Sequence, residues 1–325
     1  MSHSNERTVK MTAVSTRPAV PEIPYGRTAR RLTWEFLPKE LRGEIEGRLG
    51  GEVAKATSHN SGFTPGFAST LRAENGATLF VKTAHKTAQA VAARSYAVEA
   101  ASLKRLGPAI PSPKLLWVSE GDWITLGFEE VPSRSPERPW NDDDFAHALD
   151  LAEIIAQVIP PAGLATLAED APEFLTAWDH VAVRQPDHPH LAEAAELARG
   201  LAKVPATALA HADLRHDNLL ISDTATLACD WTNPALAPAW LDAVTLAIEA
   251  YGDGLDINEH FAARPVLANA NPDDIDAWLA AYAGFMRYSS LLPSVRNSPY
   301  VRLHADWLAT VAWEWLADRR DWNMF

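Results

Sequence analysis

Residues 211–218 read HADLRHDN and place a carboxylate, Asp213, five positions before an amide, Asn218. These groups suit phosphoryl transfer, in which a carboxylate positions and deprotonates the attacking hydroxyl and a neutral oxygen ligand helps to hold magnesium against the phosphates. We therefore expect Asp213 to act on the acceptor hydroxyl and Asn218 to be a magnesium ligand. His211 is expected to brace the loop through a hydrogen bond rather than to act as a base.

A second carboxylate for the metal is expected on a neighbouring strand end, because it must approach the same phosphates. Asp230 follows the apolar run Leu227–Cys229, twelve positions after Asn218, and one small hairpin can span that separation. Asp230 is therefore the second expected metal ligand. The alternative is that it only caps a strand.

The phosphates of a nucleotide also need a cation, which is usually a strand lysine oriented by a helix glutamate. Lys82 ends the strand-like run Thr78–Val81, and Glu99 is the only carboxylate in the helical stretch that follows. An unpaired charge at Glu99 would be poorly solvated among alanines, so we expect a Lys82–Glu99 ion pair. The loop at 60–66 lacks G-x-G-x-x-G, and we expect Ser61 and its backbone N–H groups to cover the phosphates.

The elements that must position these groups fall into two parts. Strand patterns occur at 51–58, 67–74, 77–83, 114–119 and 123–128. A stretch without Gly or Pro at 87–106 predicts one long helix among them. Later helices are expected at 142–157, 172–183, 190–203, 239–251, 272–288 and 300–319, interrupted by short strands at 219–222 and 227–230.

A chain of 325 residues exceeds one usual domain core, which favours two lobes that share a cleft. Residues 1–28 are polar and rich in proline, and we expect a loosely attached arm. The N-lobe is expected at 29–131 and the C-lobe at 132–325. The fold predicted from these patterns is α+β, with an antiparallel sheet and one long helix in the N-lobe and a helical C-lobe.

Composition narrows the partners. The formal net charge of −13 argues against nucleic acid or an anionic membrane surface and favours a cationic ligand. Cys229 is the only cysteine, so no intramolecular disulfide or Cys-built zinc site is possible. No apolar run resembles a signal peptide or a membrane span, so we expect a cytoplasmic protein.

The segment 211–218 also fits the kinase catalytic-loop pattern H-x-D-L-x-x-x-N, and the chain resembles the aminoglycoside phosphotransferase and choline kinase-like family. This resemblance covers residues 50–250 and implies a bilobal protein-kinase-like fold. It also implies a hinge at 124–132, with backbone contacts to adenine or guanine from Glu129 and Val131.

The same resemblance implies that Asp242 braces the catalytic loop as a structural residue. Two positions depart from the family pattern. Ala212 stands where glycine is common, and Asp217 stands where a small residue or proline is common. No D-F-G or A-P-E segment is present, which favours the small-molecule branch over protein kinases.

We therefore expect a kinase that uses Mg²⁺ and ATP or GTP to phosphorylate a hydroxyl of a small molecule, as a monomer or homodimer. An antibiotic resembling an aminoglycoside or a nucleoside is the preferred acceptor. A sugar, amino sugar or amino alcohol of metabolism is the first alternative, and a catalytically silent binding protein of the same fold is the second. The histidines and aspartates of 211–217 also allow a metal-dependent hydrolase.

Overall fold

The computed structural model describes residues 21, 23, 24, 28–60 and 62–322. Ser61 and most of the expected arm at 1–28 lie outside the described residues. Of the arm's described members, Ile23 and Thr28 are buried. Within the described ranges, none of the helices combines the length and apolar character that a membrane crossing needs.

The N-terminal part contains an antiparallel sheet with the strand order β1-β2-β3-β5-β4. Its strands are β1 (Val53–Ser58), β2 (Phe67–Ala73), β3 (Thr78–His85), β4 (Leu115–Glu120) and β5 (Trp123–Phe128). β3 extends two residues beyond the expected strand at 77–83, because residues 84 and 85 pair with residues 124 and 123 of β5. Lys82 therefore lies inside the strand and not at its end, where we had expected it.

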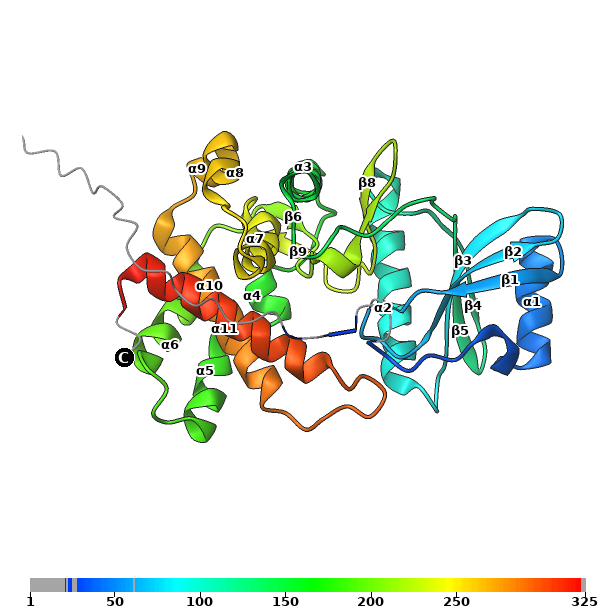
Figure 1. Cartoon of the computed structure of the whole chain (residues 1–325), viewed down its shortest axis with the longest axis horizontal. Coiled ribbons are helices and arrows are strands. Elements are labelled where there is room, and N and C mark those ends of the chain that lie inside the picture. Colours follow the sequence, from blue (N-terminus) through cyan, green and yellow to red (C-terminus); the bar gives the residue numbers. More distant parts are fainter. Residues whose placement is uncertain (1–20, 22, 25–27, 61, 323–325) are drawn as a thin grey trace, which may run out of the picture.

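Helices cover both faces of this sheet (Figure 1). The 3₁₀ turn Trp34–Phe36 and α1 (Lys39–Leu49) close one face with a small apolar cluster that includes Ile45, Leu71 and Val81. The long helix α2 (Ala90–Leu106) lies on the other face, between the sheet and the helical part of the chain. Apolar residues on this face join the large core of the C-terminal part.

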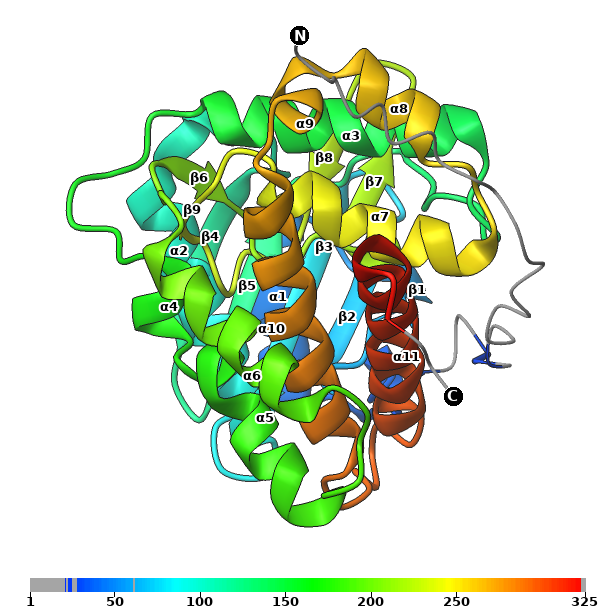
Figure 2. The same cartoon turned by 90° about the vertical axis from the view of Figure 1, so that its left-hand side faces the viewer.

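The C-terminal part is mainly helical (Figure 2). Its helices are α3 (Asp142–Gln157), α4 (Leu167–Asp170), α5 (Glu173–Arg184), α6 (Leu191–Gly200), α7 (Leu241–Asp253), α8 (Asn258–Ala263), α9 (Pro265–Ala268), α10 (Pro272–Ser290) and α11 (Val301–Arg320). Two short 3₁₀ turns of this part lie at Leu201–Lys203 and His216–Asn218, and another, Gly107–Ala109, follows α2 in the N-terminal part. The antiparallel helices α10 and α11 pack against each other, and α5 and α6 pack on α10.

Two small antiparallel ribbons complete this part. β7 (Leu219–Ile221) pairs with β8 (Thr226–Ala228), as the expected short strands predict. β6 (Ala208–Ala210) pairs with β9 (Ala235–Ala237), and the sequence did not predict this ribbon. Both of its strands read Ala-Leu-Ala, which is too short and too rich in alanine to give a strand period.

Helix α7 is buried on almost every side and connects the core to the segment 211–218. Asp242 lies in its first turn, and Glu249 lies seven positions later. A separation of seven residues is close to two helical turns, so both carboxylates face the same side of the helix. Both are bonded to the backbone of residues 211–216.

Candidate active site

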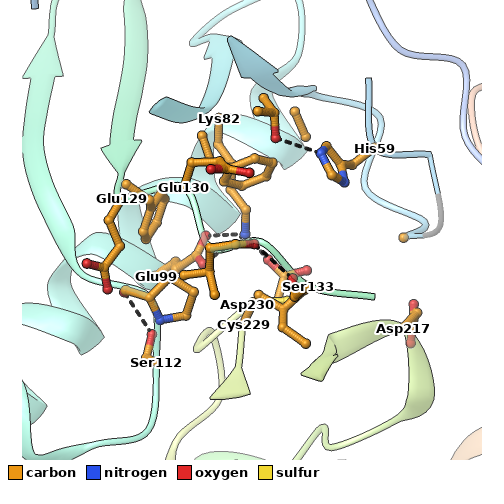
Figure 3. Close-up of a pocket in the computed structure, with 18 of the residues that line it drawn as sticks. His59, Lys82, Glu99, Ser112, Glu129, Glu130, Ser133, Asp217, Cys229 and Asp230 are labelled. Atoms are coloured by element: carbon orange, nitrogen blue, oxygen red, sulfur yellow. Dashed lines mark hydrogen bonds and ion pairs between the residues drawn. The ribbon is translucent and has the colours of Figure 1, made fainter. Parts of the chain in front are cut away.

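Lys82 lies within β3, opposite Ala68 of β2 and Leu126 of β5. Its ammonium donates to both carboxylate oxygens of Glu99 in α2, at 2.8 Å each, so the expected ion pair is present. The same ammonium also pairs with Asp230 (Figure 3). Burial opposes the charge of Lys82, but the carboxylates of Asp230 and Glu99 outweigh it and raise the pKa of Lys82. The cation is thus fixed between two carboxylates.

Asp242 holds the start of the segment 211–218. One of its carboxylate oxygens accepts the His211 N–H at 2.7 Å, and the other accepts the Ala212 N–H at 3.0 Å. The Nε2 atom of His211 lies 2.9 Å from the Cys229 carbonyl and therefore carries the ring proton in this contact. Burial lowers the pKa of His211, which keeps the ring neutral. His211 and Asp242 therefore form hydrogen bonds that hold the loop, as we had expected of them.

Two residues beside these groups adopt left-handed backbone angles. Ala212 has φ 61° and Asp230 has φ 65°. This conformation costs a residue with a Cβ roughly 1–2 kcal/mol, whereas glycine adopts it without this cost, so glycine would be more stable at position 212. The two bonds from Asp242 hold the Ala212 region, and the Asp230 carbonyl accepts the Thr232 N–H at 2.7 Å.

Asn218 lies in the 3₁₀ turn that ends this segment. Its side-chain nitrogen donates to the Asp213 carbonyl at 2.8 Å, so its side-chain oxygen is available for another partner. The Cys229 N–H donates to the Asn218 carbonyl at 2.9 Å, which places Asn218 beside the residue preceding Asp230. One amide and one carboxylate oxygen on adjacent chain segments fit a magnesium ion that takes its other ligands from phosphates and water.

The same geometry does not favour the metal-dependent hydrolase. Across residues 28–60 and 62–322, no three His, Cys, Asp or Glu side chains are grouped so as to hold a metal ion. The Nδ1 atom of His216 lies 3.0 Å from Glu249, and the His216 N–H donates to the same carboxylate at 3.0 Å. His216 therefore belongs to the support of the loop.

A buried charged network beneath the loop was not found from the sequence. Arg138 donates to both carboxylate oxygens of Asp253, at 2.5 and 2.7 Å, and lies 3.4 Å from Glu249. Although burial opposes the charge of Glu249, His216 and Arg138 hold its pKa well below the usual range. The network fixes the 3₁₀ turn that carries Asn218. Its members lie far apart in the sequence and match no short motif.

Lys82 and Asp230 line a cavity between the sheet and the helical part (Figure 3). Phe80, Phe128 and Leu220 supply apolar surface to it. The expected hinge residues Glu129 and Val131 also line it. The Glu129 N–H already donates to the Lys114 carbonyl at 3.0 Å, so the backbone group that Glu129 can offer to a base is its carbonyl.

Arg31 is a further lining residue that sequence reasoning missed. Its guanidinium donates to the carbonyls of Gly66 and Gly62, at 2.9 and 3.0 Å, and so holds both sides of the loop between β1 and β2. No pattern around residue 31 indicates this role. Ser61, the expected phosphate contact in this loop, lies outside the described residues.

The same loop contacts the C-terminal part. The Ser298 hydroxyl donates to the Phe63 carbonyl, and the Arg30 N–H donates to the Asn297 carbonyl at 2.8 Å. The Phe63 ring lies against His304 of α11, with ring centroids 4.8 Å apart. Phe63 thus joins the β1–β2 loop to α11 and to the connection before it, and Arg30, which precedes α1, adds a second contact to that connection.

Asp213 lines a second cavity, on the helical side of the first. Its carboxylate lies 3.6 Å from the Arg215 guanidinium. Burial raises the pKa of Asp213 to about 6; Arg215 opposes this shift, while Asp217 and Asp230 add to it. Asp213 and Asp230 thus line different cavities.

The fold and the site define a nucleotide-dependent phosphotransferase with a kinase-like architecture, in which the cavity of Lys82 and Asp230 lies between a five-stranded sheet and a helical part. The chain belongs to the phosphotransferase enzyme family, whose model matches residues 60–285. The fold predicted from the sequence and the family resemblance are both confirmed. Among the curated proteins, none matches this chain.

Solved structures with similar folds share little sequence with the chain. A thermostable mutant of aminoglycoside phosphotransferase APH(4)-Ia in its apo form is 16% identical, with a TM-score of 0.57 over 86% of this chain and 98% of the other. Spectinomycin phosphotransferase APH(9)-Ia, with ADP and spectinomycin, is 12% identical, with the same TM-score and the same coverage of both chains. A choline/ethanolamine kinase family protein from Mesorhizobium loti is 15% identical, with a TM-score of 0.55 over 87% and 95%.

Proposed function

We propose that the chain transfers the γ-phosphate of ATP or GTP to a hydroxyl group of a small antibiotic. Lys82, oriented by Glu99, holds the α- and β-phosphates, and Asn218 and Asp230 would bind magnesium, which would neutralise phosphate charge. Asp213 orients the acceptor hydroxyl and accepts its proton. His211 and Asp242 keep the loop that carries Asp213 in place.

One observation carries this proposal. Lys82, paired with Glu99 and Asp230, lines one cavity, and Asp213 lines another. Asn218 links the two, since its side chain donates to the Asp213 carbonyl and its own carbonyl accepts the N–H of Cys229, the residue before Asp230. Phosphoryl transfer needs a donor site and an acceptor site that meet at the transferring group. A cavity lined by the cation and a second cavity lined by the carboxylate, tied together through Asn218, would supply these two sites.

The remaining donor contacts are proposed from their positions. The Glu129 carbonyl and the backbone of Val131 would contact the base, and Ser61 would cover the phosphates with its loop. Phe80 and Leu220 line the same cavity and offer apolar surface to a base. ATP and GTP are cytoplasmic nucleotides, and we place the enzyme there.

The antibiotic acceptor is supported by the solved relatives. Among them are an APH(4)-Ia mutant in a complex with ADP and hygromycin B, with a TM-score of 0.53, and APH(9)-Ia with ADP and spectinomycin. The choline/ethanolamine kinase family protein supports the second candidate, a metabolic kinase acting on a sugar, amino sugar or amino alcohol.

Asp213→Ala tests the proposal. General-base catalysis contributes about 10²–10⁴-fold, so kcat should fall by that factor while nucleotide binding stays unchanged. Asp223→Ala removes an exposed aspartate of the β7–β8 turn and is the matched control, for which we expect normal turnover. Near-normal turnover of Asp213→Ala would reject its role. Nucleotide binding without transfer to any acceptor, in the unmodified chain, would instead favour the silent binding protein.

A further inference from the structure

The cavity beside Asp213 is large enough for a drug-sized molecule. Its volume is about 770 Å³, within the range of about 300–1,000 Å³ that is usual for ligand sites. Its walls come from α2, from residues 164–174, from the two sides of the loop at 212 and 232–235, and from α10 and α11. The cavity therefore belongs almost wholly to the helical part.

Charge in the cavity is nearly balanced around Asp213. Arg215 lines the cavity next to it, 3.6 Å away, and also pairs with Asp217 at 3.2 Å. The other charged lining residues are exposed: Arg105, Asp170 and Glu173. A polycation bound near Asp213 would lose water beside a buried guanidinium. The other carboxylates of the lining, Asp170 and Glu173, are exposed, and solvent screening makes their attraction too weak to offset that desolvation.

An aromatic and aliphatic wall faces this centre. Phe174 of α5 and Phe285 of α10 stack with ring centroids 4.4 Å apart, and both line the cavity. Met286, Val301 and Ala305 extend the same apolar surface. Such a wall stabilises a flat ring or an aliphatic ring system by burying its surface.

The inner polar groups are neutral. The Tyr282 side chain lines the cavity beside Arg215, and burial raises the pKa of its hydroxyl, which keeps it protonated. His304 also lines the cavity, and burial together with Arg215 holds the pKa of its imidazole well below the usual range. Thr232 and Ser289 add hydroxyl groups. These groups can form hydrogen bonds with a ligand without requiring a charge on it.

We propose that the acceptor is an uncharged hydroxyl compound with an apolar, ring-containing body, bound between the Phe174–Phe285 pair and Tyr282. This inference rests on the proposed phosphotransferase function and deepens it. The overall charge of −13 favours a cationic ligand, but that charge is spread over the chain, whereas the cavity wall is apolar and its buried charges are paired. Salt screens the attraction of exposed charges beyond about 10 Å, so the residues that line the cavity decide which ligand binds there more than the charges elsewhere on the chain do.

The test compares two acceptor classes with the full chain, magnesium and either nucleotide. Kanamycin and hygromycin B represent polycations, and chloramphenicol and uridine represent uncharged ring-containing hydroxyl compounds. Nucleoside diphosphate release gives kcat/KM, and thermal unfolding in the presence of MgADP gives binding without turnover. We expect at least tenfold higher kcat/KM, or tenfold tighter binding, for a member of the uncharged class.

Variants locate the binding site. Met286→Glu places a charge on the apolar wall and should weaken binding of the uncharged class at least tenfold, whereas Met286→Gln, a neutral change of similar size, should have a smaller effect. Ile154→Glu adds the same charge at a half-exposed position of α3 outside the cavity, and it should leave the binding of both compound classes unchanged. Thermal unfolding without ligand verifies that each variant is folded.

Each outcome separates the two proposals. Equal or better use of polycations overturns the inference and leaves the phosphotransferase proposal intact. Binding of the uncharged class that Met286→Glu weakens, without any phosphate transfer, supports the inference and counts against the proposed function. The inference is wrong if neither class binds or reacts. It is also wrong if Met286→Glu leaves the affinity for the uncharged class unchanged.

Discussion

The network beneath the loop yields a prediction for Glu249→Gln. The Glu249 carboxylate is 1% exposed, accepts the His216 backbone N–H at 3.0 Å, and lies 3.0 Å from the His216 Nδ1 atom and 3.4 Å from Arg138. Removing one member of a buried charged pair costs about 3–5 kcal/mol. Arg138 keeps its two bonds to Asp253, and glutamine can still accept one hydrogen bond. We therefore expect a smaller loss than this range, about 2–3 kcal/mol in the free energy of unfolding.

Urea denaturation at pH 7 measures this loss, and the variant should remain folded, since domains have stabilities of about 5–15 kcal/mol. Asp318→Asn is the matched control. Its carboxylate accepts the hydroxyl of Tyr251, a residue of the same helix α7, at an exposed site, so the change should cost less than about 1 kcal/mol.

Activity and pH provide further readouts of the same change. Asn218 lies in the turn that Glu249 fixes, so Glu249→Gln should raise the magnesium concentration needed for half-maximal turnover. The folded-state pKa of Glu249 is lowered, so its stabilisation is complete above the unfolded pKa of about 4.3 and is lost as pH falls towards the folded value. The stability difference between the two chains should thus be constant from pH 7 to 5.5. A loss no larger than that of Asp318→Asn would refute the reasoning.

Two further predictions concern Asp213, the proposed catalytic carboxylate, and the β1–β2 loop. Burial raises the pKa of Asp213 to about 6. A protonated carboxyl cannot accept the hydroxyl proton, so kcat/KM should fall about tenfold per pH unit below about pH 6. A flat pH–rate profile from about pH 5 to 8 would contradict this prediction. In Gly66→Ala the new Cβ would lie 2.2 Å from the Tyr96 hydroxyl, which should destabilise the chain by about 1–3 kcal/mol. The Tyr96 ring lies 5.7 Å from the Lys82 ammonium, so a displaced Tyr96 should also raise KM for the nucleotide. Gly47→Ala, in α1 with nothing within 4 Å of its Cβ, should instead stabilise by about 0.5–1 kcal/mol in the same denaturation assay, and equal behaviour of the two variants would show that the close contact at Gly66 is unimportant.

Much of the cleft could be predicted from the sequence, because its key groups follow local rules. Lys82 lies in a strand and Glu99 is the one carboxylate of an alanine-rich helix, so burial of both required that they meet. The spacing of Asp213, Asn218 and Asp230 corresponds to one loop and one hairpin, which the structure contains as the turn at 216–218 and the β7–β8 ribbon.

The supports and the acceptor walls could not be predicted in this way. Arg138, Glu249 and Asp253 lie on elements that meet only in the folded chain, and nothing in their neighbourhoods distinguishes them from surface charges. The cavity beside Asp213 draws on segments from residue 98 to residue 305. Its paired charges and apolar wall depend on tertiary packing, which the overall composition does not describe.

The contact between the β1–β2 loop and α11 has a consequence for the binding of the two substrates. The Phe63 ring lies against His304, which lines the cavity of Asp213, and the next residue, Thr64, lines the cavity of Lys82. The proposed donor and acceptor sites therefore lie on either side of this contact. A donor that shifts this loop must change the affinity for the acceptor, and by thermodynamic reciprocity the acceptor changes the affinity for the donor by the same factor. The two substrates should therefore bind with synergy or antagonism rather than independently.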